Sequence, residues 1–313
     1  MTATVTASAV AARLAQAEFS SLLAGDGLRV RIGPFNAHIQ APVSALHEPL
    51  YRLYADYPLL DADCVYSLHA RIEPKRHWPR VYRPLVRFSV DGRVPHEDMP
   101  AEQALAVLEW GINLVIALRS HCFLMLHSAV LEKNGHALLL PAAPGFGKTT
   151  LCAALAHRGW RLLSDEFGLI RPGSSAFVPV PRPMALKNES IDVFRSFAPE
   201  AVLGPSIPNT RKGTVVHVKP PADSVRRHSE LAPARWIVFP RWQADARLTF
   251  EPLSKSQGFM MLAMNAFNYE LLGEAGFCTA SQVVDRSDCF RLVYSGLDEA
   301  VACFDQLVER DAP

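Results

Sequence analysis

A glycine-rich run at residues 141–150, with the sequence PAAPGFGKTT, has the residue types of a phosphate-binding loop. Gly145 and Gly147 allow backbone N–H groups to turn inward and approach phosphate oxygens without a Cβ in the way. Lys148 supplies a positive charge for the outer phosphates of a nucleoside triphosphate, and the Thr149 hydroxyl suits a Mg²⁺ ligand. The run therefore predicts binding of ATP and Mg²⁺. The candidate nucleotide-binding residues are Ala142, Ala143, Pro144, Gly145, Phe146, Gly147, Lys148, Thr149 and Thr150.

The loop lies between apolar residues 137–140 and 151–156, which predict a buried strand and a helix. Such a helix directs its positive end at the bound phosphates. Ala142 stands where the pattern G-x-x-x-x-G-K-[S/T] has its first glycine. Because alanine tolerates a positive φ poorly, either φ is negative at this position or the loop is reshaped. A strand, a glycine turn and a helix without any ligand is the alternative interpretation.

Two adjacent carboxylates, Asp165 and Glu166, follow the apolar residues 161–163. In proteins with such a loop, Mg²⁺ takes a carboxylate from the end of a neighbouring strand. Two carboxylates also allow one to hold the metal while the other accepts a proton from an attacking hydroxyl. We therefore expect Thr149, Asp165 and Glu166 at the metal, with Asp165 as the base. A solvated acidic turn is the alternative.

The remaining candidates are a histidine and several basic residues. His127 lies among apolar residues 125–129, where a hydrogen-bonded core histidine is the ordinary interpretation. Lys187 and Arg211 are candidates to neutralise charge on a transferring phosphate, and Arg182 and Lys212 are their neighbours in sequence. Ordinary exposed charges are the alternative for all of them.

Taken together, residues 126–170 resemble the catalytic domain of HPr kinase/phosphorylase, and in particular the HPr-kinase-related kinases of the A type. The resemblance rests on His127-Ser128 before the loop, the His-Arg-Gly turn at 157–159 after its helix, and Leu-Leu-Ser-Asp-Glu at 162–166. It implies a fold related to that kinase and to phosphoenolpyruvate carboxykinase. It also implies roles: Asp165 as the base, Glu166 as a metal or substrate partner, and His127 near the transferring phosphate.

The departures from that family concern the substrate. Ala142 and Pro144 replace loop residues of the bacterial HPr kinases, Glu166 replaces an aspartate, and the C-terminal signature of the phosphorylase activity is not recognisable. We therefore expect an acceptor other than HPr and no phosphorylase activity. The hypothesis is a kinase that transfers the γ-phosphoryl group of ATP to a hydroxyl of a protein, a peptide or a small molecule. The alternative is a nucleotide-binding regulatory or scaffold protein with little or no kinase activity.

The composition limits which kinds of partner and which cellular compartment we expect. Lys and Arg number 32 against 31 Asp and Glu, so no basic excess suggests nucleic-acid binding. The six cysteines are scattered without a C-x-x-C pair, which indicates free thiols and a cytoplasmic protein. The apolar residues 104–118 are interrupted by Glu109 and Asn113, which favours a buried helix over a membrane span. The family resemblance makes a homo-oligomer reasonable.

The order of elements predicts an α/β fold in two parts. Residues 1–120 are expected to form a small α+β domain, and residues 121–313 the P-loop kinase domain. The first part has predicted strands at 28–32, 36–40, 65–72 and 84–90 and helices at 1–24, 46–54 and 101–120. The second has predicted strands at 123–131, 136–140, 160–163, 214–219 and 235–239, helices at 149–157, 254–272 and 298–308, and irregular chain at 171–183.

Overall fold

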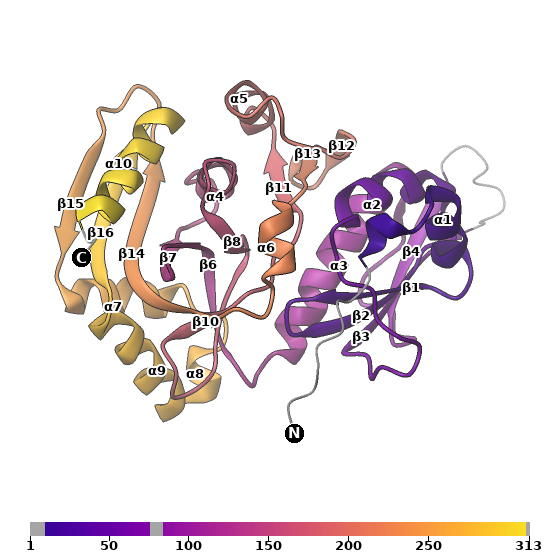
Figure 1. Cartoon of the computed structure of the whole chain (residues 1–313), viewed down its shortest axis with the longest axis horizontal. Coiled ribbons are helices and arrows are strands. Elements are labelled where there is room, and N and C mark those ends of the chain that lie inside the picture. Colours follow the sequence, from indigo (N-terminus) through magenta and orange to yellow (C-terminus); the bar gives the residue numbers. More distant parts are fainter. Residues whose placement is uncertain (1–9, 76–83, 311–313) are drawn as a thin grey trace.

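The computed structural model describes residues 10–75 and 84–310, and it confirms a mixed α/β fold (Figure 1). Of the helix expected at 1–24, residues 1–9 lie outside the described residues, and a helix begins only at Gln16. The first part of the chain contains η1 (Ala11–Arg13), α1 (Gln16–Ala24), β1 (Leu28–Ile32), β2 (Phe35–Gln40), η2 (Ser44–Leu46), α2 (His47–Tyr54), β3 (Leu68–Lys75), β4 (Leu85–Val90), β5 (Met99–Pro100), η3 (Ala101–Gln103) and α3 (Ala104–Arg119).

The N-terminal sheet has the order β1-β2-β3-β4-β5, and only β2 and β3 run parallel. Burial alternates along β1, β3 and β4, as the two-residue period of a half-buried strand requires. The buried face packs on α3, whose first six residues are all buried and whose later buried residues lie on one side. The helix at Ala101–Arg119 is long and apolar enough to cross a membrane, but 61% of its most apolar stretch is buried inside the fold.

The large sheet carries the glycine-rich loop, and its order is β10-β9-β6-β7-β14-β16-β15, with β8 added on β6. β7, β14 and β16 run parallel, and β6 is antiparallel to β7. The second part of the chain contains β6 (Leu124–Lys133), β7 (His136–Pro141), α4 (Lys148–Ala156), β8 (Arg161–Ser164), β9 (Phe167–Ile170), β10 (Ala176–Val178), β11 (Met184–Lys187), α5 (Ser190–Phe197), β12 (Ile207–Thr210), β13 (Gly213–Val218), α6 (Ala222–Arg226), β14 (Ala232–Trp242), β15 (Thr249–Leu253), α7 (Lys255–Met264), α8 (Tyr269–Leu272), α9 (Glu274–Asp285), β16 (Asp288–Tyr294) and α10 (Leu297–Arg310).

Helices cover both faces of this sheet. One core lies between the strands and α4, α5 and α10, and a second core lies between the strands and α7 and α9. Helix α4 is buried over nearly its whole circumference, because residues 151–156 are all small or apolar. A third sheet, β11-β13-β12, packs beside α4 and α5 (Figure 1). The large sheet therefore holds α4, and with it the loop, in a fixed place.

The helix predicted at 254–272 is wrong as a single element, because the chain breaks between α7 and α8. Phe267 N donates to Met125 O at 2.8 Å, and the Asn268 side chain bonds the backbone of Met125 and of Phe123. These bonds to β6 replace helical bonds at residues 265–268. The prediction of irregular chain at 171–183 is also wrong at β10, and the strand expected at 65–72 lies at 68–75. The α-helices and strands that the sequence did not predict are β5, β9, β10, β11, β12, β15, β16, α5, α6 and α9.

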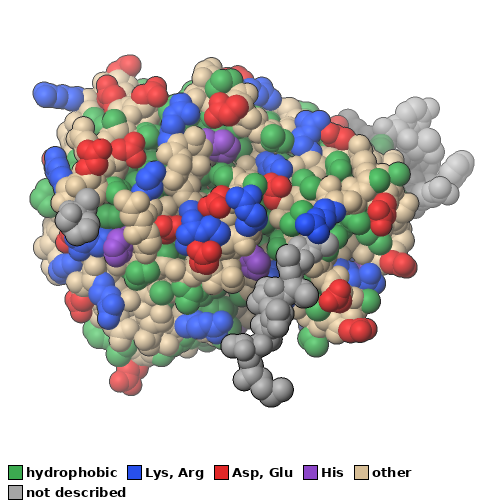
Figure 2. Space-filling model, viewed as in Figure 1, with side chains coloured by type: hydrophobic (Ala, Val, Ile, Leu, Met, Phe, Trp, Pro, Cys, Tyr) green, Lys and Arg blue, Asp and Glu red, His purple; other side chains and the backbone are tan. Residues whose placement is uncertain are grey.

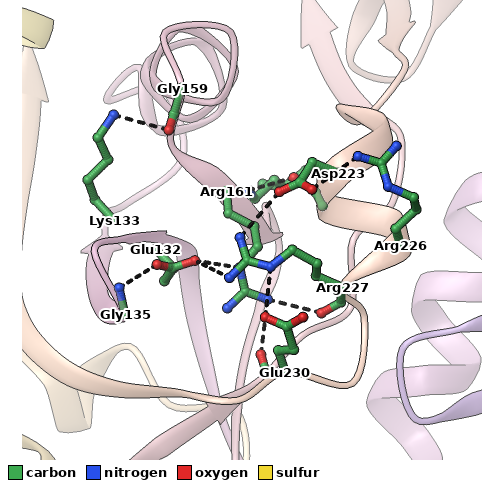
Figure 3. Close-up of polar contacts among 11 residues, drawn as sticks. Glu132, Lys133, Gly135, Gly159, Arg161, Asp223, Arg226, Arg227 and Glu230 are labelled. Carbon is green, nitrogen blue, oxygen red and sulfur yellow. Dashed lines mark hydrogen bonds and ion pairs between the residues drawn. The ribbon is translucent and has the colours of Figure 1, made fainter.

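Figure 2 shows acidic and basic side chains interspersed over one face of the molecule, in keeping with the balanced composition. Inside the fold, one buried pair of opposite charges joins β6 to β8. Glu132 on β6 and Arg161 on β8 are 4% and 6% exposed, and Arg161 Nε donates to Glu132 at 2.5 Å (Figure 3). Arg161 also donates to the backbone oxygens of Arg227 and Glu230, both at 3.0 Å. Burial raises the pKa of Glu132, but the hydrogen bonds from Arg161 and Gly135 outweigh it and hold the pKa below its usual value.

Replacing Arg161 by alanine will lower the free energy of unfolding by about 3 kcal/mol, because it leaves the buried Glu132 carboxylate with only the Gly135 N–H and the more exposed Arg227, 3.5 Å away. Urea denaturation measures this loss. Arg226→Ala is the control, since Arg226 pairs with Asp223 at the surface and its side chain is 60% exposed, so less than about 1 kcal/mol is expected. Equal losses in the two variants would show that the buried pair does not secure β8.

Candidate active site

The glycine-rich loop joins the end of β7 to the start of α4. Gly145 and Gly147 have φ values of 88° and 80°, which glycine adopts without strain. Ala142 is not among the described non-glycine residues with positive φ, and it is buried. Alanine therefore fits at this position, and the first of the two explanations for the missing glycine holds.

Two aromatic residues from the ends of neighbouring strands contact the backbone of the glycine-rich loop. Tyr294, the last residue of β16, donates its hydroxyl to Gly147 O at 3.2 Å, and burial raises the pKa of that hydroxyl. Trp242, the last residue of β14, donates its backbone N–H to Phe146 O at 3.0 Å. A Cβ on Gly147 would lie 2.5 Å from the Tyr294 oxygen and 2.9 Å from Trp242 Cβ. Neither aromatic residue was predicted from the sequence, since only the parallel strand order brings them to the loop.

The loop forms one wall of a cleft of about 630 Å³. Lys148 lies in it, is only 8% exposed, and its Nζ has no hydrogen-bond partner among the described residues. A buried ammonium without a partner is costly, and an anionic group in the cleft would satisfy it. Predicted residues that line the cleft are His127, Ala142, Ala143, Pro144, Gly145, Gly147, Lys148, Thr149, Thr150, Glu166 and Lys187.

The acidic pair reaches the cleft because β6 changes its partner there. Residues 130–132 of β6 pair with β8, and residues 124–127 pair with β9. Asp165 and Glu166 are the two residues between β8 and β9, so they bulge out of the sheet at the point of exchange. Ser164 Oγ accepts hydrogen bonds from the N–H groups of Glu166 and Phe167, at 3.3 and 3.0 Å, and so fixes the bulge.

Asp165 lies beneath the cleft rather than in its wall. Its Oδ1 is shielded from solvent and has no hydrogen-bond partner among the described residues. Burial raises its pKa to about 6, against the lowering effect of Lys148 and of a hydrogen bond with the Thr149 side chain, while Glu166 raises it further. A pKa near neutrality suits a group that exchanges a proton.

His127 and Glu166 face each other across the bulge, with His127 Nε2 3.9 Å from Glu166 Oε1. Burial lowers the pKa of His127, Lys148 lowers it further and Glu166 opposes both, so the imidazole is neutral at pH 7. Its ring packs against Phe267, with 5.3 Å between the centroids. His127 is thus a cleft residue and not a fully buried core histidine.

The basic wall of the cleft comes from the third sheet. Lys187, at the end of β11, and Lys212, between β12 and β13, both line the cleft, whereas Arg211 does not and is exposed. Partial burial and repulsion by Lys187 lower the pKa of Lys212. Neither lysine makes an ion pair with another described residue. The loop that carries Arg211 and Lys212 therefore lies at the cleft, but Lys212 lines the cleft and Arg211 does not.

The N-terminal part of the chain supports this basic wall. The Lys212 ammonium lies 5.3 Å from the ring centroid of Trp110 on α3. Gln103, which lies before α3, donates its side-chain N–H to Asn209 O at 2.8 Å. Nothing in the sequence marks Trp110 or Gln103 as neighbours of the loop, since they are about a hundred residues away.

Arg182, the other basic neighbour in sequence, lies elsewhere. It is buried against α3, where it forms an ion pair with Glu109 at 2.5 Å and bonds Asn113. Tyr54 donates to the second oxygen of Glu109 at 2.7 Å, which completes the carboxylate's bonding. Arg182 therefore joins the two parts of the chain and takes no part in the cleft.

Among the described residues no group of three or more His, Cys, Asp and Glu side chains is placed to hold a metal by itself. Mg²⁺ bound to a nucleotide needs fewer protein ligands, because phosphate oxygens and water supply the rest. The side-chain oxygens of Thr149 and Glu166, which line the cleft, and Asp165 Oδ1, which lacks a partner among the described residues, are available for that arrangement.

Comparison with known proteins yields no assignment: no family model matches the chain, and a search of curated proteins finds no match.

Replacing Gly147 by alanine will lower the free energy of unfolding by about 3 kcal/mol, through the positive φ and the overlap with Tyr294 and Trp242. Gly145→Ala is the matched control, since Gly145 has the same kind of φ but open space around its Cβ position. It should cost about 1–2 kcal/mol. Thermal or urea unfolding compares them, and equal losses would mean that the aromatic pair does not constrain the loop.

Proposed function

We propose that the protein is a kinase that binds ATP with Mg²⁺ in this cleft and transfers the γ-phosphoryl group to a hydroxyl of an acceptor. The observation that carries the proposal is Lys148, a buried cation without a partner at the start of α4, in a cleft that two further lysines line. A triphosphate supplies the negative charge that these side chains lack. The helix start and the loop N–H groups add to the same potential.

Each side chain has a role that follows from its place. Lys148, Lys187 and Lys212 neutralise phosphate charge, and Thr149 and Glu166, which line the cleft, would hold Mg²⁺, which when bound neutralises charge on the phosphates. Asp165, with its raised pKa, accepts the proton of the attacking hydroxyl. His127 is neutral and orients the acceptor or the phosphoryl group through its ring nitrogen.

The acceptor enters from the open side of the cleft, where Glu166 and Phe267 are about half exposed. Catalysis on this proposal consists of positioning and charge neutralisation, as in other phosphoryl transfers. The resemblance of residues 126–170 to the HPr-kinase-related kinases agrees with this proposal, and both membership of that family and the identity of the acceptor stay proposals.

Replacing Lys148 by methionine will abolish the rise in melting temperature that ATP and Mg²⁺ cause in the wild type. Without ligand the variant will stay within about 1 kcal/mol of the wild type, because the Lys148 ammonium has no hydrogen-bond partner to lose. Thermal unfolding with and without nucleotide measures both effects. Lys219→Met, outside the cleft, is the control and should retain the full shift. Absence of a shift in the wild type would defeat the nucleotide site itself.

Transfer of label from γ-labelled ATP to an acceptor in lysate of the host will depend on Asp165. Asp165→Asn removes the base while it keeps the size of the side chain, so label on the acceptor should fall at least a hundredfold. Binding of ATP without a labelled acceptor, in both wild type and variant, would instead favour a nucleotide-binding regulator.

The same reaction should lose rate as the pH falls below about 6, where the Asp165 carboxylate becomes protonated. Glu166→Gln will move this loss to lower pH, since the Glu166 charge raises the pKa of Asp165. His127→Asn serves as the control and should leave the position of the loss unchanged. If the loss instead follows His127, the histidine and not Asp165 is the titrating group.

A further inference from the structure

Three side chains beside the glycine-rich loop have no role in the cleft described above. Phe146 at the tip of the loop is 38% exposed, and Trp242 at the end of β14 is 46% exposed. The Arg241 guanidinium carbon lies 5.6 Å from the centroid of the Phe146 ring. The Arg241 guanidinium thus lies over the Phe146 ring, and we call the three side chains beside the loop the aromatic platform.

The platform is fixed to the loop by backbone contacts. Trp242 N donates to Phe146 O at 3.0 Å, and the Trp242 indole N–H donates to Ser295 O at 3.0 Å. Trp242 Cβ also lies against the Gly147 backbone. A ligand whose phosphates lie on the loop therefore has the platform as an immediate and rigid neighbour.

We propose that the aromatic platform is the subsite for the base of the nucleotide, with a purine stacked on Phe146 and Arg241. The proposal rests on the proposed function, because it needs the phosphates on the loop. Aromatic rings and guanidinium planes both stack on bases, and a purine offers the larger π-face. Trp242 is held in place by its hydrogen bonds, whereas the exposed Phe146 ring at the tip of the loop is free to contact a bound base.

Two variants and two ligands test the subsite. Phe146→Ala and Arg241→Ala are compared with wild type for binding of Mg²⁺–ATP and of Mg²⁺–inorganic triphosphate by calorimetry. Stacking predicts that ATP binds roughly tenfold more weakly to each variant, while the affinity for triphosphate, which has no base, stays unchanged. Phe277→Ala on α9, another exposed phenylalanine, is the control and should change neither affinity.

Other outcomes overturn the proposal in distinguishable ways. If the wild type binds ATP no more tightly than triphosphate, or if Arg241→Ala leaves ATP binding unchanged, the base lies elsewhere and the kinase proposal survives. Equal weakening of both ligands by Arg241→Ala would show that the platform acts through the loop and not through the base. If the wild type binds neither ligand, the proposed function itself fails.

Discussion

The cleft depends on one constraint, that β6 has to pair with two strands in succession along a single edge. The chain leaves β6 after β8 and returns as β9, and the two residues of the exchange are Asp165 and Glu166. The buried pair of Glu132 and Arg161 fixes the register of β8, and therefore the place of the exchange. A shift by one residue would turn the carboxylates to the other face of the sheet and away from the loop.

Sequence patterns predicted what local chemistry determines. The loop between β7 and α4, the acidic pair after a short strand and the α/β character follow from residue types and periodicity over a few positions. The break between α7 and α8 was not predictable, since it depends on bonds from Asn268 to β6, far away in sequence. For the same reason the sequence favoured Arg211 over Lys212: the choice is made by Trp110 and by the conformation of the β12–β13 turn.

The described residues of the first part of the chain support the cleft without lining it. Helix α3 holds Arg182 through Glu109 and approaches Lys212 through Trp110, so the N-terminal sheet braces the strands that carry the basic wall. The cleft therefore combines a glycine-rich loop with cations placed by a separate sheet. On the proposed function, such a division would let the loop hold the phosphates while the opposite wall sets the distance to the acceptor.

The hydrophobic core beneath α3 also contains residues from the second part of the chain. Met125, Phe167, Leu169 and Val178 pack into it together with residues of the first sheet. The first part therefore buries its apolar surface partly against the second, although the second has two further cores of its own, so the chain should unfold as one cooperative unit. The two parts cannot be exchanged independently between proteins: a change of N-terminal region requires matching changes on β6 and β9, and β9 begins directly after the acidic bulge.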